Sequence, residues 1–220
     1  MYSFAQRDDT KVFDEPFYAF YLNHTGKMHP GREEILESQP HSYEEVFSIL
    51  NDADCPLLYV KNMAHQMRLI PFTYFEEFIN ILLIRNPEQL IASFATVIEN
   101  PDMLDIGIAD QYRIWKHLEK MGKSAIVIDS GDLLSNPQKV LHVLCERIGI
   151  QFYDQMLNWD AGARPEDGVW APYWYKNVHK SVGFEKQQSS SRPFPVHCTE
   201  LLDEALPLYR ELYSHAIKAQ

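Results

Sequence analysis

The sequence predicts an α/β fold: a three-layer arrangement of a mainly parallel sheet with flanking helices. Three observations support this. Four short runs contain continuous rather than alternating apolar residues, as in buried strands. Stretches with helical spacing separate these runs. The length of 220 residues suits one domain with a sizeable core. We therefore expect a single domain over residues 1–220.

The predicted strands follow one another along the first two thirds of the chain. They span residues 11–14, 57–61, 79–84 and 125–129. Ligands bind beyond the carboxyl ends of the strands in such sheets. The ends of these strands and the turns after them carry Asp14, Lys61, Arg85 and Asp129, so we expect the chemistry there.

The predicted helices are recognised by apolar residues that recur every three or four positions. They span residues 44–50, 87–99, 110–121, 137–148 and 200–217. We expect Pro207 to kink or divide the last of them. Residues 187–195, rich in Ser and Pro, predict a surface loop.

Charge and composition exclude several classes of function. The formal net charge of −11 and the lack of any Lys/Arg run argue against nucleic acid as a partner. No apolar run reaches the roughly 18 residues of a membrane helix, and the first residues lack the apolar core of a signal peptide. The three cysteines are far apart, so neither a disulfide framework nor a zinc motif is predicted. A reducing cytoplasm is the expected location, and we expect no bound metal.

The most informative segment joins the third predicted strand to the next helix. Arg85 follows the strand, Pro87 suits the first turn of the helix, and Ser93 lies further along it. Arginine offers a rigid fork of donors to phosphate, and a nearby hydroxyl adds another donor. The alternative is that Arg85 pairs with a surface carboxylate and Ser93 fills a small gap.

Arginine followed after seven residues by serine, across a strand-to-helix turn, resembles the 3′-phosphate site of sulfotransferases that use 3′-phosphoadenosine 5′-phosphosulfate (PAPS). Further segments resemble the same family, and its bacterial and plant sulfotransferase-like branch in particular: residues 14–19, 61–65, 125–150, 152–159 and 167–172. The resemblance implies a P-loop NTPase-like fold. It also implies transfer of a sulfonyl group from PAPS to a hydroxyl or amine of a small acceptor, with Arg85 and Ser93 binding the donor.

Two residues after the second strand are candidates for catalysis. A histidine can take a proton from the acceptor, and a lysine can neutralise charge on the bridging oxygen. The resemblance assigns these roles to His65 and Lys61, although their spacing differs from the tighter Lys-x-His of the better known cytosolic members. The alternative for His65 is a cap of the helix that it begins.

Glu15, just past the first strand, is a rival for the catalytic base. A half-buried carboxylate at a strand end can have a raised pKa. Some bacterial sulfotransferases use a glutamate in about this position, which the resemblance places at Glu15. The alternative is an acid at a helix start, stabilised by the helix dipole.

Residues 162–175 place two Trp and two Tyr in a loop without regular period. These rings could hold an adenine or an apolar, ring-containing acceptor. The alternative is a lid that packs on its own core. Arg164, at the start of this loop, is a further candidate for contact with a donor phosphate, because the family often supplies a late basic residue.

The sequence contains no Gly-rich turn after a strand, which the resemblance implies for the 5′-phosphosulfate. We therefore expect the first strand and its phosphate loop, about 15 to 20 residues, to lie upstream of Met1. The alternative is a true loss, which would leave a non-catalytic nucleotide-binding or protein-interaction domain. A relative of nucleotide kinases is a weaker third possibility.

Overall fold

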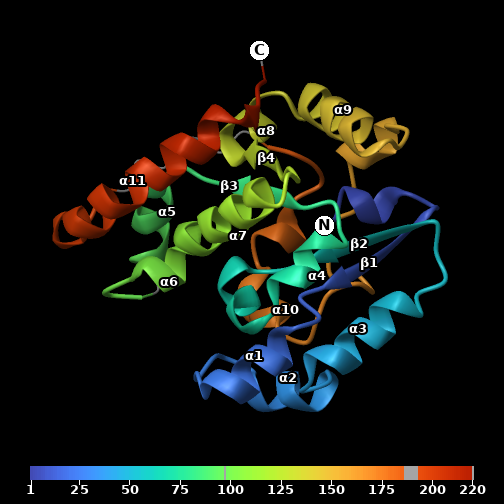
Figure 1. The fold of residues 1–220 in the computed structure, drawn as a ribbon, viewed down its shortest axis with the longest axis horizontal. Coiled ribbons are helices and arrows are strands. Elements are labelled where there is room, and N and C mark those ends of the chain that lie inside the picture. Colours follow the sequence, from blue (N-terminus) through green and yellow to red (C-terminus); the bar gives the residue numbers. More distant parts are fainter. Residues whose placement is uncertain (97, 186–192, 220) are drawn as a thin grey trace. The chain divides into compact units, whose positions relative to one another are not determined.

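The computed structural model describes residues 1–96, 98–185 and 193–219. The chain divides into two compact units. Figure 1 labels their helices and strands and colours them in chain order. The first unit contains residues 1–70 and 153–184, and the second contains residues 71–152 and 185–220. The prediction of one domain over residues 1–220 stays a prediction. Of the surface loop predicted at 187–195, residues 187–192 lie outside the described part.

The first unit is built on two parallel strands, β1 (Thr10–Asp14) and β2 (Leu57–Lys61), in which Asp14 is the register partner of Lys61. Its helical elements are η1 (Phe4–Gln6), α1 (Tyr18–Thr25), α2 (Arg32–Ser38), α3 (Tyr43–Asn51), η2 (Ala64–Leu69), η3 (Asp154–Leu157), α10 (Ala171–Trp174) and η4 (Val178–Lys180). Local chemistry sets their ends. Gly26, in the left-handed region at φ 67°, ends α1, and the Ser42 side chain caps α3 by accepting from the Glu45 N–H.

A buried cluster joins α1 and α2 to the late aromatic loop. Trp170 is 1 % exposed and packs with residues of both helices, which are Tyr18, Ala19, Tyr21, Leu22 and Ile35. The Trp170 ring meets the Tyr18 ring edge-on at 5.2 Å between centroids. This packing fixes the start of α10 on the first unit.

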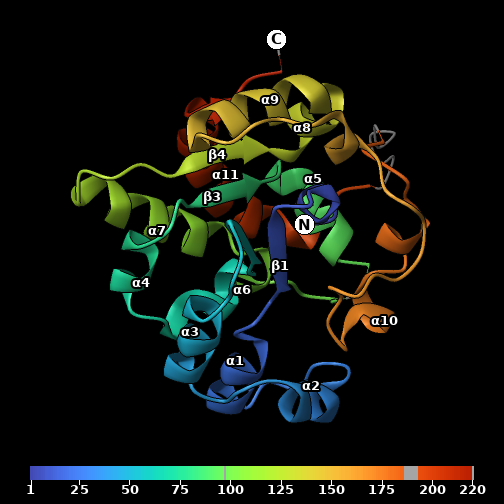
Figure 2. The same cartoon turned by 90° about the vertical axis from the view of Figure 1, so that its right-hand side faces the viewer.

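The second unit has a three-stranded parallel sheet in the order β3-β4-β5, with β3 (Ile81–Ile84), β4 (Ile126–Asp129) and β5 (Ala216–Ile217). Its helical elements are α4 (Phe72–Glu76), α5 (Pro87–Phe94), α6 (Met103–Ile106), α7 (Ile108–Lys120), α8 (Ser130–Ser135), α9 (Pro137–Ile148), η5 (Val196–Cys198) and α11 (Thr199–Ser214). Figure 2 shows β3 and β4 side by side within this unit. α11 packs against α5, α7 and the sheet.

The predicted strand and helix order is confirmed, as are the parallel sheets with flanking helices. The expectation of uniformly buried strands is wrong except for β4, the middle strand of its sheet. In β3 the exposure alternates, and Leu83 is 53 % exposed, because successive side chains of a strand point to opposite faces of the sheet. Within residues 1–96, 98–185 and 193–219, no helix combines the length and apolar composition needed to cross a membrane.

Two helix ends differ from the prediction. The helix expected over 87–99 ends at Phe94, where the Thr96 side chain donates to the Ser93 carbonyl and competes with further helical turns. The helix expected over 200–217 ends at Ser214, because Ala216 and Ile217 pair with β4 instead. It runs through Pro207 without being divided there.

Candidate functional site

The carboxyl ends of β1 and β2 bring acidic and basic side chains together. Because the two strands are parallel and in register at Asp14 and Lys61, both end at the same edge of the pair. The first-unit groups that meet there are Asp14, Glu15, Lys61, Gln66 and Tyr175, which we call the Glu15 cluster. Tyr175 reaches it from the chain just after α10.

Glu15 has an unusual backbone. Its φ of 42° is the only positive value for a non-glycine residue in the described part of the chain. Its N–H donates to the Lys61 carbonyl at 2.7 Å, and its own carbonyl accepts from the Tyr18 N–H and from Gln39 Nε2, both at 3.0 Å. These bonds hold a conformation that costs about 1–3 kcal/mol and that concentrates at functional sites.

Lys61 lies among three acceptors. Its Nζ donates to Glu15 Oε1 and, at 2.9 Å, to the Tyr175 hydroxyl, and it lies 3.3 Å from Asp14 Oδ1. Burial alone would lower the pKa of Lys61, but the charges of Glu15 and Asp14 outweigh burial and raise that pKa above its ordinary value. Lys61 is therefore a charged counter-ion of two buried carboxylates.

Gln66 supports the second oxygen of Glu15. It lies in η2 and is 1 % exposed, and its Nε2 donates to Glu15 Oε2 at 2.5 Å. Both oxygens of the Glu15 carboxylate therefore accept from the protein. The sequence pattern did not identify Gln66, because nothing in its spacing distinguishes it from other residues of a short helix.

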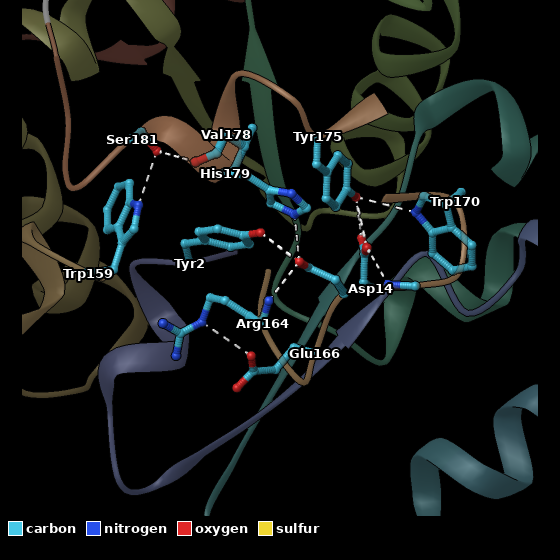
Figure 3. A network of polar contacts seen from close by, with 12 residues as sticks. Tyr2, Asp14, Trp159, Arg164, Glu166, Trp170, Tyr175, Val178, His179 and Ser181 are labelled. Carbon is cyan, nitrogen blue, oxygen red and sulfur yellow. Dashed lines mark hydrogen bonds and ion pairs between the residues drawn. The ribbon is translucent and has the colours of Figure 1, made fainter. Parts of the chain in front are cut away.

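Tyr175 connects the aromatic loop to the strand ends, as Figure 3 shows. Its hydroxyl donates to the Asp14 carboxylate at 2.8 Å and accepts from Trp170 Nε1 at 3.4 Å. The Gly168 N–H donates to Asp14 Oδ2 at 3.3 Å. Burial is the main reason that the pKa of Tyr175 is raised. Asp14 therefore anchors the loop at two points.

Asp167 is a second polar centre in the same loop, and Figure 3 labels its partners Tyr2, Arg164 and His179. Its carboxylate accepts from the Tyr2 hydroxyl at 2.8 Å and from the Arg164 N–H at 2.9 Å, and it bonds His179 Nε2 at 2.9 Å. Its side chain is 5 % exposed. These contacts join Tyr2 near the chain start, the beginning of the loop and η4, which sequence spacing did not predict.

His65, one of the two candidate bases, is the second residue of η2. It is not the helix cap, since the N-cap is Met63 and no side chain caps this helix. Its ring meets the Tyr21 ring at 5.3 Å between centroids. Burial lowers the pKa of His65 to about 4, and the nearby positive charges of His29, Lys27 and Lys61 add to the effect. At neutral pH the imidazole is uncharged.

Arg164 contacts one residue of its own loop and one near the start of the chain. Its Nε lies 3.3 Å from Glu166 Oε2, and its guanidinium lies over the Tyr2 ring at 5.7 Å from the centroid (Figure 3). The aromatic loop itself is divided. Trp170 belongs to the core as the lid alternative predicts, whereas Tyr173 and Trp174 are 45 % and 46 % exposed.

Arg85 and Ser93 belong to the second unit. Arg85 directly follows β3, and Asn86 caps α5 by accepting from the Glu88 N–H at 2.9 Å. Ser93 lies in the last turn of the helix, since α5 ends at Phe94. Both side chains are half-buried. The partial positive charge of the α5 N-terminus lies next to Arg85, which suits an anion.

The structure brings Glu15 and Lys61 into contact and places His65 and Arg164 in the same unit. Arg85 and Ser93 share the turn into α5 and the helix itself. In the residues that the structure describes, no group of three or more His, Cys, Asp or Glu side chains is placed to hold a metal ion.

A comparison with family models identifies the family of this chain. A model of the sulfotransferase domain matches residues 1–216. The chain is 40 % identical over 218 residues to branched-chain-amino-acid aminotransferase-like protein 1 of Arabidopsis thaliana, and 37 % identical over 219 residues to protein 2 of that name. Both matches cover 98 % of this chain and 39 % of the relative. The chain thus spans well under half the length of these curated relatives.

Solved structures with the same fold are also sulfotransferase domains. The domain from the curacin biosynthetic pathway has a TM-score of 0.50 at 18 % identity and covers 88 % of this chain and 77 % of its own. The domain from the Synechococcus PCC 7002 olefin synthase has a TM-score of 0.53 at 15 % identity. The match covers 92 % of this chain and 75 % of the olefin synthase domain. At these identities the likeness concerns the fold.

Proposed function

The chain belongs to the sulfotransferase domain family, and from that premise we propose that it transfers a sulfonyl group from PAPS to a hydroxyl or amine of a small acceptor. The observation that carries the proposal is the position of Arg85, between the end of β3 and the capped start of α5. There an arginine fork and a helix N-terminus both favour a phosphate. Ser93 adds a hydroxyl donor from the same helix.

The reacting groups are proposed at the Glu15 cluster and at His65. Transfer needs a group that removes a proton from the acceptor as it attacks sulfur. Uncharged His65 is in the form that accepts a proton, although its low pKa makes it a weak base. Glu15 has the contacts and the constrained backbone expected of a functional residue. Both remain candidates, with Glu15 favoured by geometry.

Lys61 and Arg164 are proposed to assist with the donor. In this role Lys61 neutralises charge on the bridging oxygen as the nucleotide departs. Its side chain is 25 % exposed, against 1 % for that of Asp14 and 7 % for that of Glu15. Arg164, 19 % exposed, is proposed to contact a donor phosphate by leaving Glu166.

Calorimetry with adenosine 3′,5′-bisphosphate, the product nucleotide, tests the donor site. We expect the parent chain to bind it and Arg85→Ala to bind at least about tenfold more weakly, since a charged hydrogen-bonded contact contributes about 1.5–3 kcal/mol. The control is Arg147→Ala, an exposed arginine of α9 in the same unit. Equal binding by Arg85→Ala and the parent would remove Arg85 from the site.

The alternative is a domain that binds the nucleotide without turnover. The contacts of Lys61 favour it, because all three of its neighbours are groups of the protein itself. Transfer of the ³⁵S label from PAPS to acceptor mixtures separates the two functions. Nucleotide binding that depends on Arg85, without release of adenosine 3′,5′-bisphosphate from PAPS, would support the alternative.

A further inference from the structure

The Glu15 cluster carries an excess of buried negative charge. Asp14 and Glu15 contribute two carboxylates, whose side chains are 1 % and 7 % exposed, against the ammonium of Lys61. The N-terminal amine, whose charge interacts with Asp14 and Lys61, is buried, and burial is the main reason that its pKa is lowered to about 5, so it is uncharged at neutral pH. A buried charge without a partner is costly, and a ligand of opposite charge relieves that cost. Lys61 already faces three acceptors, so the charge that the cluster still lacks is positive.

The cluster also contains a buried acceptor atom without a partner. Gln66 is 1 % exposed and its Nε2 donates to Glu15, but its Oε1 accepts nothing from the described residues. Asn62, which directly follows Lys61 in the chain, likewise has a buried Oδ1 without a partner in the described structure. Buried acceptors normally have partners, and an unpaired one costs about 1–3 kcal/mol. The missing group at this site is a hydrogen-bond donor.

We infer that the Glu15 cluster is the acceptor subsite and that it takes a primary amine bound as its ammonium. The inference rests on the proposed function and names the acceptor class for that site. An ammonium supplies both missing properties, positive charge and several N–H donors. A hydroxyl supplies one donor and no charge, and a sulfonate offers only acceptors. The partly exposed members, Lys61 and Tyr175, give the side from which the amine arrives.

The reaction then forms a sulfamate. The ammonium gives one proton to the base, and the nitrogen lone pair attacks sulfur to form the N–S bond. The S–O bond to the 5′-phosphate of PAPS breaks, and its electron pair leaves with adenosine 3′,5′-bisphosphate. A second proton leaves the nitrogen for solvent, so the product is R–NH–SO₃⁻ and two protons are released for each transfer.

NMR of the Gln66 side-chain amide tests the inference without requiring turnover. The signal is assigned by its loss in Gln66→Met. The ¹⁵N-labelled chain is titrated with n-butylammonium, n-butanol and tetramethylammonium at equal ionic strength. We expect n-butylammonium to shift the Gln66 signal at roughly tenfold lower concentration than the other two, because n-butanol lacks the charge and tetramethylammonium lacks N–H donors.

Two variants locate the effect. Glu15→Gln keeps the side-chain shape and removes one negative charge, so the preference for n-butylammonium should fall about tenfold. Glu166→Gln changes a carboxylate of the same unit that pairs with Arg164 outside the cluster, and it should keep the parent response. A loss in both variants would mean a general charge effect and would overturn the inference, as would equal shifts by n-butylammonium and n-butanol.

Calorimetry with adenosine 3′,5′-bisphosphate on the same samples keeps this inference separate from the proposed function. Suppose that nucleotide binding depends on Arg85 while the Gln66 signal responds equally to all three probes. In that case the inference of an amine acceptor is wrong and the proposal of sulfonyl transfer stands. If the nucleotide does not bind, the proposed function fails. An ammonium response would then describe a cation site without a role in transfer, and the acceptor inference would fall with the function.

Discussion

Lys61 shows at the scale of one residue how a single cation stabilises two buried carboxylates. Asp14 and Glu15 are its neighbours across the end of the strand pair, and its pKa is raised by their charges. Removing one partner of a buried ion pair leaves a charge without compensation, and that loss is larger than the net contribution of the pair.

We therefore expect Lys61→Met to lower the free energy of unfolding by roughly 3 kcal/mol, measured by urea denaturation. The double variant Lys61→Met/Glu15→Gln should recover part of that loss, because it leaves one fewer buried charge. Lys116→Met is the control, since Lys116 pairs with Glu119 at the surface and should change the midpoint little. A loss in Lys61→Met no greater than in the control would mean that the cluster is not a buried ion network.

The lowered pKa of His65 predicts how the free energy of unfolding depends on pH. Its pKa is about 4 in the folded chain against 6.5 in the unfolded one, so between these values the unfolded chain binds the extra proton. Stability is then fully present above pH 6.5 and falls as the pH is lowered through 6.5 towards 4. The contribution is on the order of 3 kcal/mol.

His65→Phe, which keeps a ring and cannot titrate, should flatten this part of the pH profile of the free energy of unfolding. His142→Gln, at an exposed histidine of α9, is the matched control and should keep the parent slope. An unchanged slope in His65→Phe would show that His65 is solvated in the folded protein.

At the scale of elements, close packing as well as hydrogen bonds fixes the loop that leads into α10. A Cβ placed on Gly168 would lie 2.1–2.4 Å from atoms of the Trp170 ring, far inside contact distance. Trp170 is nearly fully buried between α1 and α2 and cannot move without opening that core. Gly168 is therefore required by close packing.

Gly168→Ala should lower the free energy of unfolding by about 1–3 kcal/mol, the usual cost of overpacking, and should shift the tryptophan emission as Trp170 leaves its site. Val169→Ala, at the neighbouring residue that is 45 % exposed, is the control and should leave both measurements near the parent values. A normal emission spectrum and midpoint in Gly168→Ala would contradict the packing argument.

At the scale of the whole molecule, the two units carry different parts of the proposed function. The candidate groups for reaction lie in the first unit, and Arg85 and Ser93 lie in the second. A ligand that binds only the folded chain stabilises it by mass action. Binding at Arg85 should therefore protect β3 and α5 in particular.

Adenosine 3′,5′-bisphosphate at a hundred times its dissociation constant should raise the free energy of unfolding by about 2.7 kcal/mol. Hydrogen exchange should show the strongest added protection at residues 81–94. The same nucleotide concentration should leave Arg85→Ala unprotected there and should protect Arg147→Ala like the parent. Protection confined to the first unit would place the nucleotide site elsewhere.

Much of the fold could be predicted because local sequence encodes it. The strand at 57–61 and the helix at 137–148 have the predicted bounds. Adjacent apolar residues define the strand, whereas recurring apolar residues, the Asn136 cap and Gly149 define the helix. Strand β5 was missed because two residues are too few to show a periodic pattern of apolar side chains. It exists only through pairing with Val127 and Ile128.

The site was predicted in part for the same reason. Glu15 follows β1 and Lys61 is the last residue of β2, so the rule for the carboxyl ends of parallel strands identified both. Gln66 and Tyr175 follow no strand, and Tyr175 lies 114 positions from Lys61. Contacts over that distance depend on the path of the intervening chain, which spacing does not encode.

The sequence alone determined the α/β class, the order of most strands and helices, and the turns where chemistry could occur, because short-range patterns of apolar, charged and capping residues decide these features. Only the tertiary structure decided that two carboxylates share one lysine, that Gln66 and Tyr175 join them, and that Trp170 fixes the loop. Burial makes those contacts matter energetically, and burial depends on residues that are distant in the chain.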